Sequence, residues 1–185
     1  MLAFKGFQKG LICRGYKFKR NGINETEEAN CRKNGFHCAE NPLDCLYHYS
    51  DWKNSVYYQV EALGDLDETD GDSQISCTKM RIIKEVSLLE LLIEGAAFMV
   101  KYPDRKWSCE VFHEQAEATD GYAVVRGKNP TAAGKKNAIL LLLKEEPDSS
   151  QIAEVTVLVI DGERYFPDVW YNIYGFAEES EGKAA

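Results

Sequence analysis

The segment from residue 86 to residue 102, VSLLELLIEGAAFMVKY, constrains the fold more than any other part of the chain. Ser87 and Glu90 have the spacing of a capping box, in which each side chain accepts a hydrogen bond from the other residue's backbone N–H. Apolar residues then recur at helical intervals, and Pro103 follows, where it would stop a helix. We therefore predict one long helix that separates two parts of the chain with different character.

Beyond Pro103, every regular segment has a strand-like pattern. Between residues 121 and 139, glycines and other small residues recur at short spacing, which predicts a tightly wound β-roll with turns at Gly127 and Gly134. Asp161-Gly162 is a typical two-residue hairpin signal. The predicted strands lie within residues 106–115, 121–127, 137–146, 152–166 and 169–176.

Before the long helix, strand and helix patterns alternate. Asn24 and Glu27 have capping-box spacing and Gly35 can end a helix, so we predict a short helix over residues 24–35. Asn41-Pro42 is typical of a helix start and predicts a second short helix. The acidic stretch 64–73 is predicted to be a loop, and strands are predicted at residues 2–7, 11–18, 36–39, 55–63 and 74–83.

These patterns together predict an α+β fold. The expected head domain, residues 1–106, has a mixed split sheet with two or three helices. An all-β domain of β-roll or hairpin type is expected over residues 107–178, and residues 179–185 are expected to form a frayed tail.

Charge is unevenly distributed along the chain. The net charge is −8, so the chain as a whole is a poor generic binder of nucleic acid. Residues 1–20, however, contain six basic residues and no acidic one, whereas residues 61–72 contain six acidic residues and no basic one. One end of the fold is therefore expected to be locally positive, although two ordinary solvated surfaces would give the same pattern.

The apolar segments indicate where in the cell the protein is expected, and the cysteine spacing indicates whether it binds a metal. No segment resembles a signal peptide or approaches the length of a membrane span, so we expect a soluble protein of the host bacterial cytoplasm with reduced cysteines. Cys31, Cys38 and Cys45 recur every seven residues, with His37 and His48 nearby. Because no Cys-x-x-Cys pair is present, buried packing cysteines are favoured over a zinc site, and no metal is predicted.

The stretches FKGF, CRGYKF, GFHCAENPLDCLYHY and YYQVEALG resemble an uncharacterised domain family found in phages and in gut and soil bacteria. That family's pattern is a Tyr-Lys-Gly-Phe start, a Cys-Arg-Gly strand, and Gly-Phe-His-x-Cys followed by an Asn-Pro-led helix that ends in tyrosines. Here Cys38 follows His37 directly, and the family's Gly/Ala-rich repeat section is almost absent. The resemblance implies a β-rich end but no established activity.

The order of strands in the head also resembles, more distantly, the split sheet of ADP-ribosyltransferases, which use NAD. That resemblance implies that Lys5 and Gly6 hold the nicotinamide amide. It implies that Tyr47 and Tyr49 stack on the ring, with Phe36 and His37 on the neighbouring strand. The sequence departs from this family because the first position is Lys rather than His or Arg. Glu61, in the spelling Gln-x-Glu, comes one strand too early for the catalytic carboxylate.

Three functions follow from these observations. The first is a phage- or mobile-element-encoded inhibitor of bacterial defence, of anti-CRISPR type, acting on a bacterial protein or nucleoprotein complex or on its guide RNA. The second is an ADP-ribosyltransferase-like enzyme that modifies a host macromolecule with NAD as cofactor, and the third is an oligomeric assembly module. Whether any reaction is catalysed is left open.

The site prediction depends on one geometric condition. The first strand and the strand that carries His37 must lie side by side and leave a hollow at the start of the following helix. His37, beside a helix start, is suited to phosphate or to general acid–base chemistry, and Arg14 with Lys5 to clamping a phosphate. The candidate catalytic residues are His37 and Glu61, and the candidate ligand-binding residues are Lys5, Gly6, Arg14, Phe36, Tyr47 and Tyr49.

Overall fold

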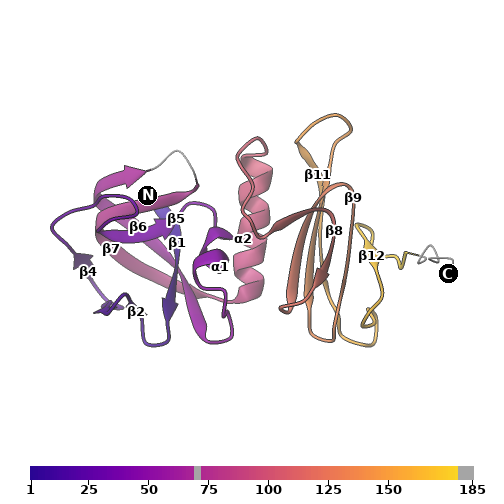
Figure 1. Cartoon of the computed structure of the whole chain (residues 1–185), viewed down its shortest axis with the longest axis horizontal. Helices are drawn as coiled ribbons and strands as arrows, with labels where there is room; N and C mark the ends of the chain where they lie inside the picture. The colour runs from indigo at the N-terminus through magenta and orange to yellow at the C-terminus, as the bar shows by residue number, and fades with distance from the viewer. Residues whose placement is uncertain (69–71, 179–185) are drawn as a thin grey trace. The chain divides into compact units, whose positions relative to one another are not determined.

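The computed structural model describes residues 1–68 and 72–178, so the predicted frayed tail, residues 179–185, lies outside the described residues. The chain divides into two compact units, Met1–Gly95 and Ala96–Ala185. Figure 1 shows the elements of each unit along the chain. The division falls inside the long helix, whereas the sequence predicts it near residue 106.

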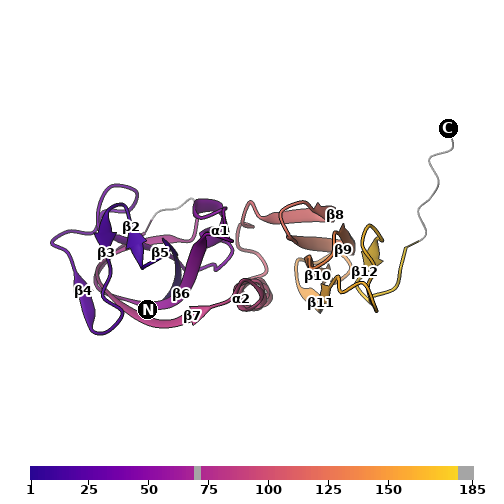
Figure 2. The ribbon, with the colours of Figure 1, turned by 90° about the horizontal axis from the view of Figure 1, so that it is seen from below.

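The N-terminal unit is a small barrel of four antiparallel strands that closes on itself. Strands β1 and β7 each pair with both β5 and β6, so the hydrogen-bonded circuit runs β1–β5–β7–β6 and returns to β1. Figure 2 shows this circuit as a ring. Alternate side chains point into the ring and fill it, as they do in barrels of few strands. The four strands are β1 (Leu2–Gln8), β5 (Phe36–Ala39), β6 (Ser55–Glu68) and β7 (Gln74–Val86).

Three short strands extend the barrel. β2 (Ile12–Cys13) and β3 (Tyr16–Lys17) form a hairpin beside β1, and β4 (Ile23–Glu25) pairs with β7. The single strand predicted over residues 11–18 is therefore wrong, because Arg14 and Gly15 turn the chain with positive φ angles of 48° and 81°.

The helix predicted over residues 24–35 is also wrong. Asn24 is buried and its side chain bonds the backbone instead of capping a helix. Its Oδ1 accepts the Lys19 N–H at 2.8 Å, and its Nδ2 donates to the Lys19 and Met80 carbonyls at 3.1 and 3.2 Å. Competition of this kind between an Asn side chain and helical hydrogen bonds favours turns and strands.

The described residues contain two α-helices, α1 (Asp44–His48) and α2 (Leu88–Lys101). The capping box of α2 is confirmed: the Ser87 N–H donates to Glu90 Oε2 at 2.8 Å, and the Glu90 N–H donates to Ser87 Oγ at 3.2 Å. At α1, Asn41 Oδ1 accepts the Leu43 N–H at 3.1 Å. Neither helix is long and apolar enough to cross a membrane.

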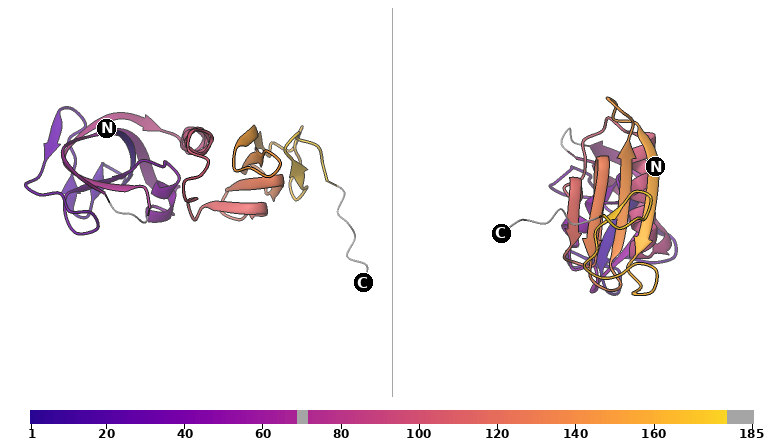
Figure 3. Two further views of the ribbon diagram at one scale, coloured as in Figure 1. Left: turned by 90° about the horizontal axis from the view of Figure 1, so that it is seen from above. Right: turned by 90° about the vertical axis from the view of Figure 1, so that its right-hand side faces the viewer.

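The C-terminal unit is built around three parallel strands. β9 (Tyr122–Gly134) has β8 (Val111–Ala118) on one side and β10 (Ile139–Glu145) on the other, both parallel to it. β11 (Ile152–Val159) pairs antiparallel with β10, and β12 (Tyr171–Asn172) with the end of β9. Figure 3, in its right-hand view, shows these strands side by side. β8, β9 and β10 follow one another along the chain and run parallel, so the chain winds in successive coils. β9 and the start of β10 lie in the segment whose glycine and alanine spacing predicts a β-roll.

A corner in this winding is held by one carboxylate. Glu114 faces residues 127–130, which bulge out of the ladder between β8 and β9. Glu114 has a φ of 64°, and its carboxylate oxygens accept the N–H groups of Lys128 and Asn129 at 2.9 and 3.0 Å. Gly127 lies against this carboxylate, with no space for a Cβ atom.

The α+β class is therefore wrong, because the described chain is mostly strand, with two sheets and two helices. The N-terminal sheet is a closed antiparallel barrel rather than a mixed split sheet. Strand β6 also runs to Glu68, into the stretch predicted as an acidic loop. At Asp161-Gly162 the predicted hairpin is replaced by a turn in which Asp161 Oδ1 accepts the N–H groups of residues 163, 164 and 165.

Candidate functional site

Lys5 lies inside the barrel. It alternates along β1 with Ala3 and Phe7, which belong to the interior core, and only 4% of its surface is exposed. Its Nζ donates to the His37 carbonyl oxygen at 2.7 Å and to Cys13 Sγ at 3.5 Å. The nitrogen also lies 5.2 and 5.6 Å from the ring centroids of Phe7 and Phe18. A carbonyl, a thiol and two aromatic faces therefore take the place of a carboxylate partner.

Tyr49 closes the outer side of this group. Its hydroxyl donates to Cys13 Sγ at 3.0 Å, and its backbone oxygen accepts the Tyr57 hydroxyl at 2.6 Å. The ring covers Gly6 so closely that a Cβ atom there would lie 2.4 Å from Tyr49 Cδ2. Burial and the hydrogen bond to Cys13 raise the pKa of Tyr49, which keeps the phenol protonated as a donor.

His37 does not share the position of Lys5. Its neighbours on β5, Phe36 and Cys38, point into the core, so strand alternation turns the imidazole to the outer face. Its Nε2 accepts the Arg32 N–H at 2.9 Å. Burial, followed by the charges of Lys5 and Arg14, lowers the pKa of His37, so the ring is neutral at neutral pH. It acts here as a hydrogen-bond acceptor for the backbone.

The remaining predicted residues lie apart from one another. Phe36 is buried in the core, with its ring centroid 4.9 Å from that of Phe18. Tyr47 is 63% exposed on α1. Glu61 lies opposite Leu2 on β6 and pairs with Arg81 across the sheet at 2.7 Å.

The structure thus brings Lys5, Gly6 and Tyr49 together around Cys13, which the sequence analysis did not select. It does not bring His37 and Glu61 together, because the register of β1 separates them by about four residues, roughly 13 Å along the strand. The interior beside Lys5 is filled by aromatic rings. Within residues 1–68 and 72–178, no group of three or more His, Cys, Asp or Glu side chains is arranged to hold a metal ion.

A second feature of this unit is an exposed positive surface. Arg14, at the turn between β2 and β3, is exposed, and so are the basic residues that follow it. Arg14, Lys17, Lys19 and Arg20 take part in none of the ion pairs between described residues. Arg20 lies over the Tyr58 ring, 5.9 Å from its centroid. Tyr16, beside Arg14, is 39% exposed. We call this surface the basic hairpin; it consists of Arg14, Lys17, Lys19 and Arg20.

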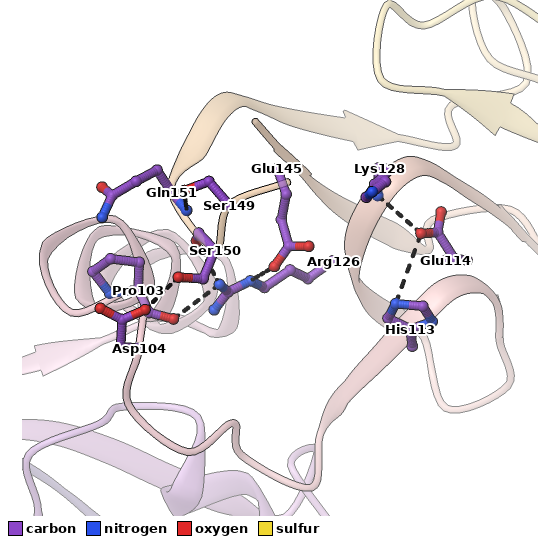
Figure 4. Close-up of polar contacts among 10 residues, drawn as sticks. All are labelled: Pro103, Asp104, His113, Glu114, Arg126, Lys128, Glu145, Ser149, Ser150 and Gln151. Carbon is purple, nitrogen blue, oxygen red and sulfur yellow. Dashed lines mark hydrogen bonds and ion pairs between the residues drawn. The ribbon is translucent and has the colours of Figure 1, made fainter. Parts of the chain in front are cut away.

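The C-terminal unit contains a buried cation that sequence reasoning missed. Arg126 on β9 is fully buried, and Figure 4 shows its guanidinium reaching Glu145 and the backbone at Pro103 and Ser150. Its Nε donates to Glu145 Oε1 at 2.8 Å, and its Nη2 donates to the two backbone oxygens at 2.9 and 2.7 Å. Its Cζ lies 4.6 Å from the Trp107 ring centroid, and its Nη1 has no partner among the described residues.

This cluster ties two connecting segments to the sheet. Pro103 follows α2 and Ser150 precedes β11, so Arg126 fixes both segments against β9. The Ser150 hydroxyl also hydrogen-bonds the Asp104 carboxylate. The only signal in the sequence is a lone Arg within the apolar run YAVVRG, and such a residue is ordinarily taken to face solvent.

Comparison with known proteins adds a family but no activity. A family described as a domain of unknown function (DUF7666) matches residues 1–94, the extent of the N-terminal unit to within one residue. No curated protein and no solved structure matches the chain.

Proposed function

We propose that this chain, which belongs to the DUF7666 family through residues 1–94, acts by binding rather than by catalysis. In this proposal it is a phage- or mobile-element-encoded protein that interacts with a bacterial nucleoprotein of the defence machinery, as anti-CRISPR proteins do. The basic hairpin contacts phosphates of the RNA in that complex. The single observation that carries the proposal is the contrast between an exposed basic hairpin and candidate catalytic groups that are already engaged in structural contacts.

The basic hairpin has the chemistry of a phosphate-binding surface. Four exposed cations lie within seven residues, on a chain whose net charge is −8. Lys and Arg side chains that neutralise phosphates release counterions, which supplies most of the sequence-independent affinity for nucleic acid. The Tyr16 side chain is 39% exposed, and its ring packs edge-on against Phe18 at 4.7 Å and tilted against Phe36 at 5.0 Å. The part of the ring that stays exposed lies beside the basic residues, where it can contact an unpaired base of single-stranded RNA.

The excess of acidic residues in the rest of the chain favours a nucleoprotein as the target rather than nucleic acid alone. A surface of net negative charge repels bulk nucleic acid and favours a basic protein groove. A chain with one basic hairpin and an otherwise acidic surface is therefore suited to a nucleoprotein, where exposed RNA lies next to basic protein.

The geometry favours binding over ADP-ribosyl transfer. A transferase requires a carboxylate that faces the nicotinamide ribose, and Glu61 instead pairs with Arg81. Lys5 and Gly6, the residues expected to hold the nicotinamide, are covered by interior side chains and by the Tyr49 ring. The transferase alternative stays a prediction, and titration with NAD tests it directly.

The first experiment measures RNA binding by the full chain. Fluorescence anisotropy with a labelled single-stranded RNA is compared between the native protein and the double variant Arg14→Glu/Lys17→Glu. The matched control is Lys128→Glu/Lys136→Glu, which changes the net charge equally with exposed lysines of the other unit. We expect at least about tenfold weaker binding for the hairpin variant only. Equal binding by all three proteins contradicts the proposal.

The second experiment addresses the target. The full chain is incubated with a purified CRISPR effector complex, and both co-elution and the integrity of the guide RNA are measured. We expect co-elution with an intact guide, lost in the hairpin double variant. Cleavage of the guide would contradict a function by binding alone, and absence of co-elution would contradict this class of target.

A further inference from the structure

The sheet of the C-terminal unit is open, unlike the closed barrel, and it ends in two outer strands. β11 is the last strand on one side and β8 on the other, as the right-hand view of Figure 3 shows. No strand within residues 1–68 and 72–178 pairs with the outer side of either. An outer strand presents a row of backbone N–H and C=O groups that another strand can pair with, and natural sheets usually block such edges.

The edge at β8 is blocked. Its ladder with β9 shifts register between His113 and Gln115, and Glu114 at that point has a φ of 64°. Glu117, further along the strand, adds an exposed carboxylate. A bulge and charged side chains are two of the ways in which proteins prevent an outer strand from pairing.

The edge at β11 lacks these features. The strand reads IAEVTVLV, with no Pro and no Lys, and Glu154 is its single charged residue. Its ladder with β10 is regular from Val159 to Glu154. Most of its residues are β-branched, and such side chains fit a pleated sheet. β11 is therefore a straight, mostly apolar edge that is suited to accepting another strand.

The hydrogen bonds to β10 show which backbone groups of β11 point outward. The Ile160 N–H donates to the Ala138 carbonyl oxygen at 2.9 Å, so these opposed residues form a hydrogen-bonded pair. Hydrogen-bonded pairs recur at every second residue of an antiparallel ladder, so Leu158 and Thr156 also bond β10. The outward N–H and C=O groups then belong to three valines: Val155, Val157 and Val159.

The side chains of these valines lie on the sheet face opposite the core. Leu158 and Ile160, which alternate with them, belong to the hydrophobic core of the unit. Val155 and Val159 are 43% and 42% exposed. An exposed apolar row thus accompanies the unpaired backbone groups along the same strand.

We infer that β11 pairs with β11 of a second copy of this chain, antiparallel and across a two-fold axis. Outward backbone groups of both copies meet when the axis passes through a residue of the strand. With the axis at Thr156, Val155 lies opposite Val157 of the copy, and Thr156 lies opposite itself, which is a favourable cross-strand pair. The two Glu154 side chains are then four residues apart, roughly 13 Å along the strand. With the axis at Val155 they would be diagonal neighbours and repel, so the register at Thr156 is the one that fits a copy of the same strand.

The mass of the full chain in solution tests the inference. Light scattering after size-exclusion chromatography is measured over rising protein concentration at about 0.3 M salt, which screens the net charge of −8 on each copy. We expect the mass to rise from the monomer value of 20.9 kDa toward twice that value. A mass that stays at 20.9 kDa up to millimolar protein overturns the inference.

Two matched variants locate the contact. Val155→Lys and Phe112→Lys each replace an exposed apolar residue of an outer strand, 43% exposed on β11 and 52% exposed on β8. We expect Val155→Lys to raise the dissociation constant of the dimer at least about tenfold, because it places an unpaired ammonium in the valine row. Phe112→Lys changes the net charge equally and should leave the constant unchanged. Equal constants in the two folded variants overturn the assignment to β11.

Amide hydrogen exchange, followed by NMR, distinguishes strand pairing from association through another surface. We expect the amides of Val155, Val157 and Val159 to exchange fast in dilute protein and to slow as the dimer forms. Those of Thr156 and Leu158 should be protected at both concentrations, because they bond β10. Outward amides that stay fast in the dimer overturn the inference. None of these measurements depends on the proposed RNA binding.

Discussion

Among the residues that the structure describes, each unit buries one cation on a β-strand, and the two cations have different partners. Arg126 in the C-terminal unit has a carboxylate at 2.8 Å, two backbone carbonyls and an indole ring. Lys5 in the N-terminal barrel has one carbonyl, one thiol and two phenyl rings.

The two cations therefore make different kinds of contact. A planar guanidinium with five donors can hold several segments at once, which is what Arg126 does for the segments around Pro103 and Ser150. The ammonium of Lys5 instead contacts the His37 carbonyl and Cys13 Sγ, with no carboxylate among its hydrogen-bond partners. Neither cation is exposed, so the contacts proposed with a partner's phosphates are left to the basic hairpin.

The largest effect is expected from removing the partner of Arg126. Glu145→Ala leaves a fully buried guanidinium without its carboxylate, and breaking such a pair costs about 3–5 kcal/mol of unfolding free energy. Urea unfolding followed by tryptophan fluorescence measures the loss, since Trp107 and Trp170 both lie in that unit. The control, Glu146→Ala, removes a neighbouring exposed carboxylate and should change stability little. Equal stability of the two variants would remove the structural role of Arg126.

A smaller loss is expected at Gly6. Gly6→Ala places a Cβ atom 2.4 Å from the Tyr49 ring, and overpacking of this kind costs about 1–3 kcal/mol. The double variant Gly6→Ala/Tyr49→Ala removes the clash. We expect the double variant to lose less unfolding free energy than the sum of the losses in the two single variants. Simple additivity would mean that the ring does not confine Gly6.

Lys5→Met is expected to change stability by less than about 1.5 kcal/mol, because Met has a similar length and no buried carboxylate is left unpaired. Denaturant unfolding of the N-terminal unit, followed by backbone circular dichroism, measures the change. A loss as large as that of Glu145→Ala would show that the two cations are equivalent and would break the comparison.

The smallest effect concerns pH and His37. Because the folded-state pKa of His37 is lowered below 6.5, the unfolded chain binds a proton first as the pH falls through 6.5. Stability from this residue is therefore complete above pH 6.5 and decreases below it, down to the lowered pKa. The urea midpoint should decrease when the pH is lowered from 7.5 to 5.5, and the decrease should be smaller in His37→Gln. An identical pH dependence in the variant would contradict the acceptor role of the imidazole.

Local signals predicted those parts of the fold that depend on neighbouring residues. The capping box of Ser87 and Glu90 specifies the start of α2 because both partners lie within one helical turn. The same pattern at Asn24 and Glu27 failed, because Asn24 bonds Met80, which is 56 residues away. A long-range contact of this kind leaves no periodic signal in the sequence.

Closure of the barrel explains why the candidate site was predicted only in part. Residues 3–7 of β1 are buried on both faces, so alternation does not indicate which face holds the interior. Lys5 was therefore assigned to an open hollow together with His37, although the two side chains point to opposite faces. Arg126 and Cys13 were missed because each depends on partners brought close by folding alone, from residues 103–150 and 5–49 respectively.

The most direct test of the account measures RNA affinity against salt concentration for the native chain, Lys5→Met and Arg14→Glu/Lys17→Glu. Each phosphate contact with a single strand contributes roughly 0.7 to the slope of log K against log salt. The account predicts that Lys5→Met keeps the native slope, whereas the hairpin variant loses about 1.4, the share of two contacts. An unchanged slope in the hairpin variant, or a slope lost in Lys5→Met, would contradict the claim that the exposed hairpin, and not the barrel interior, carries the function.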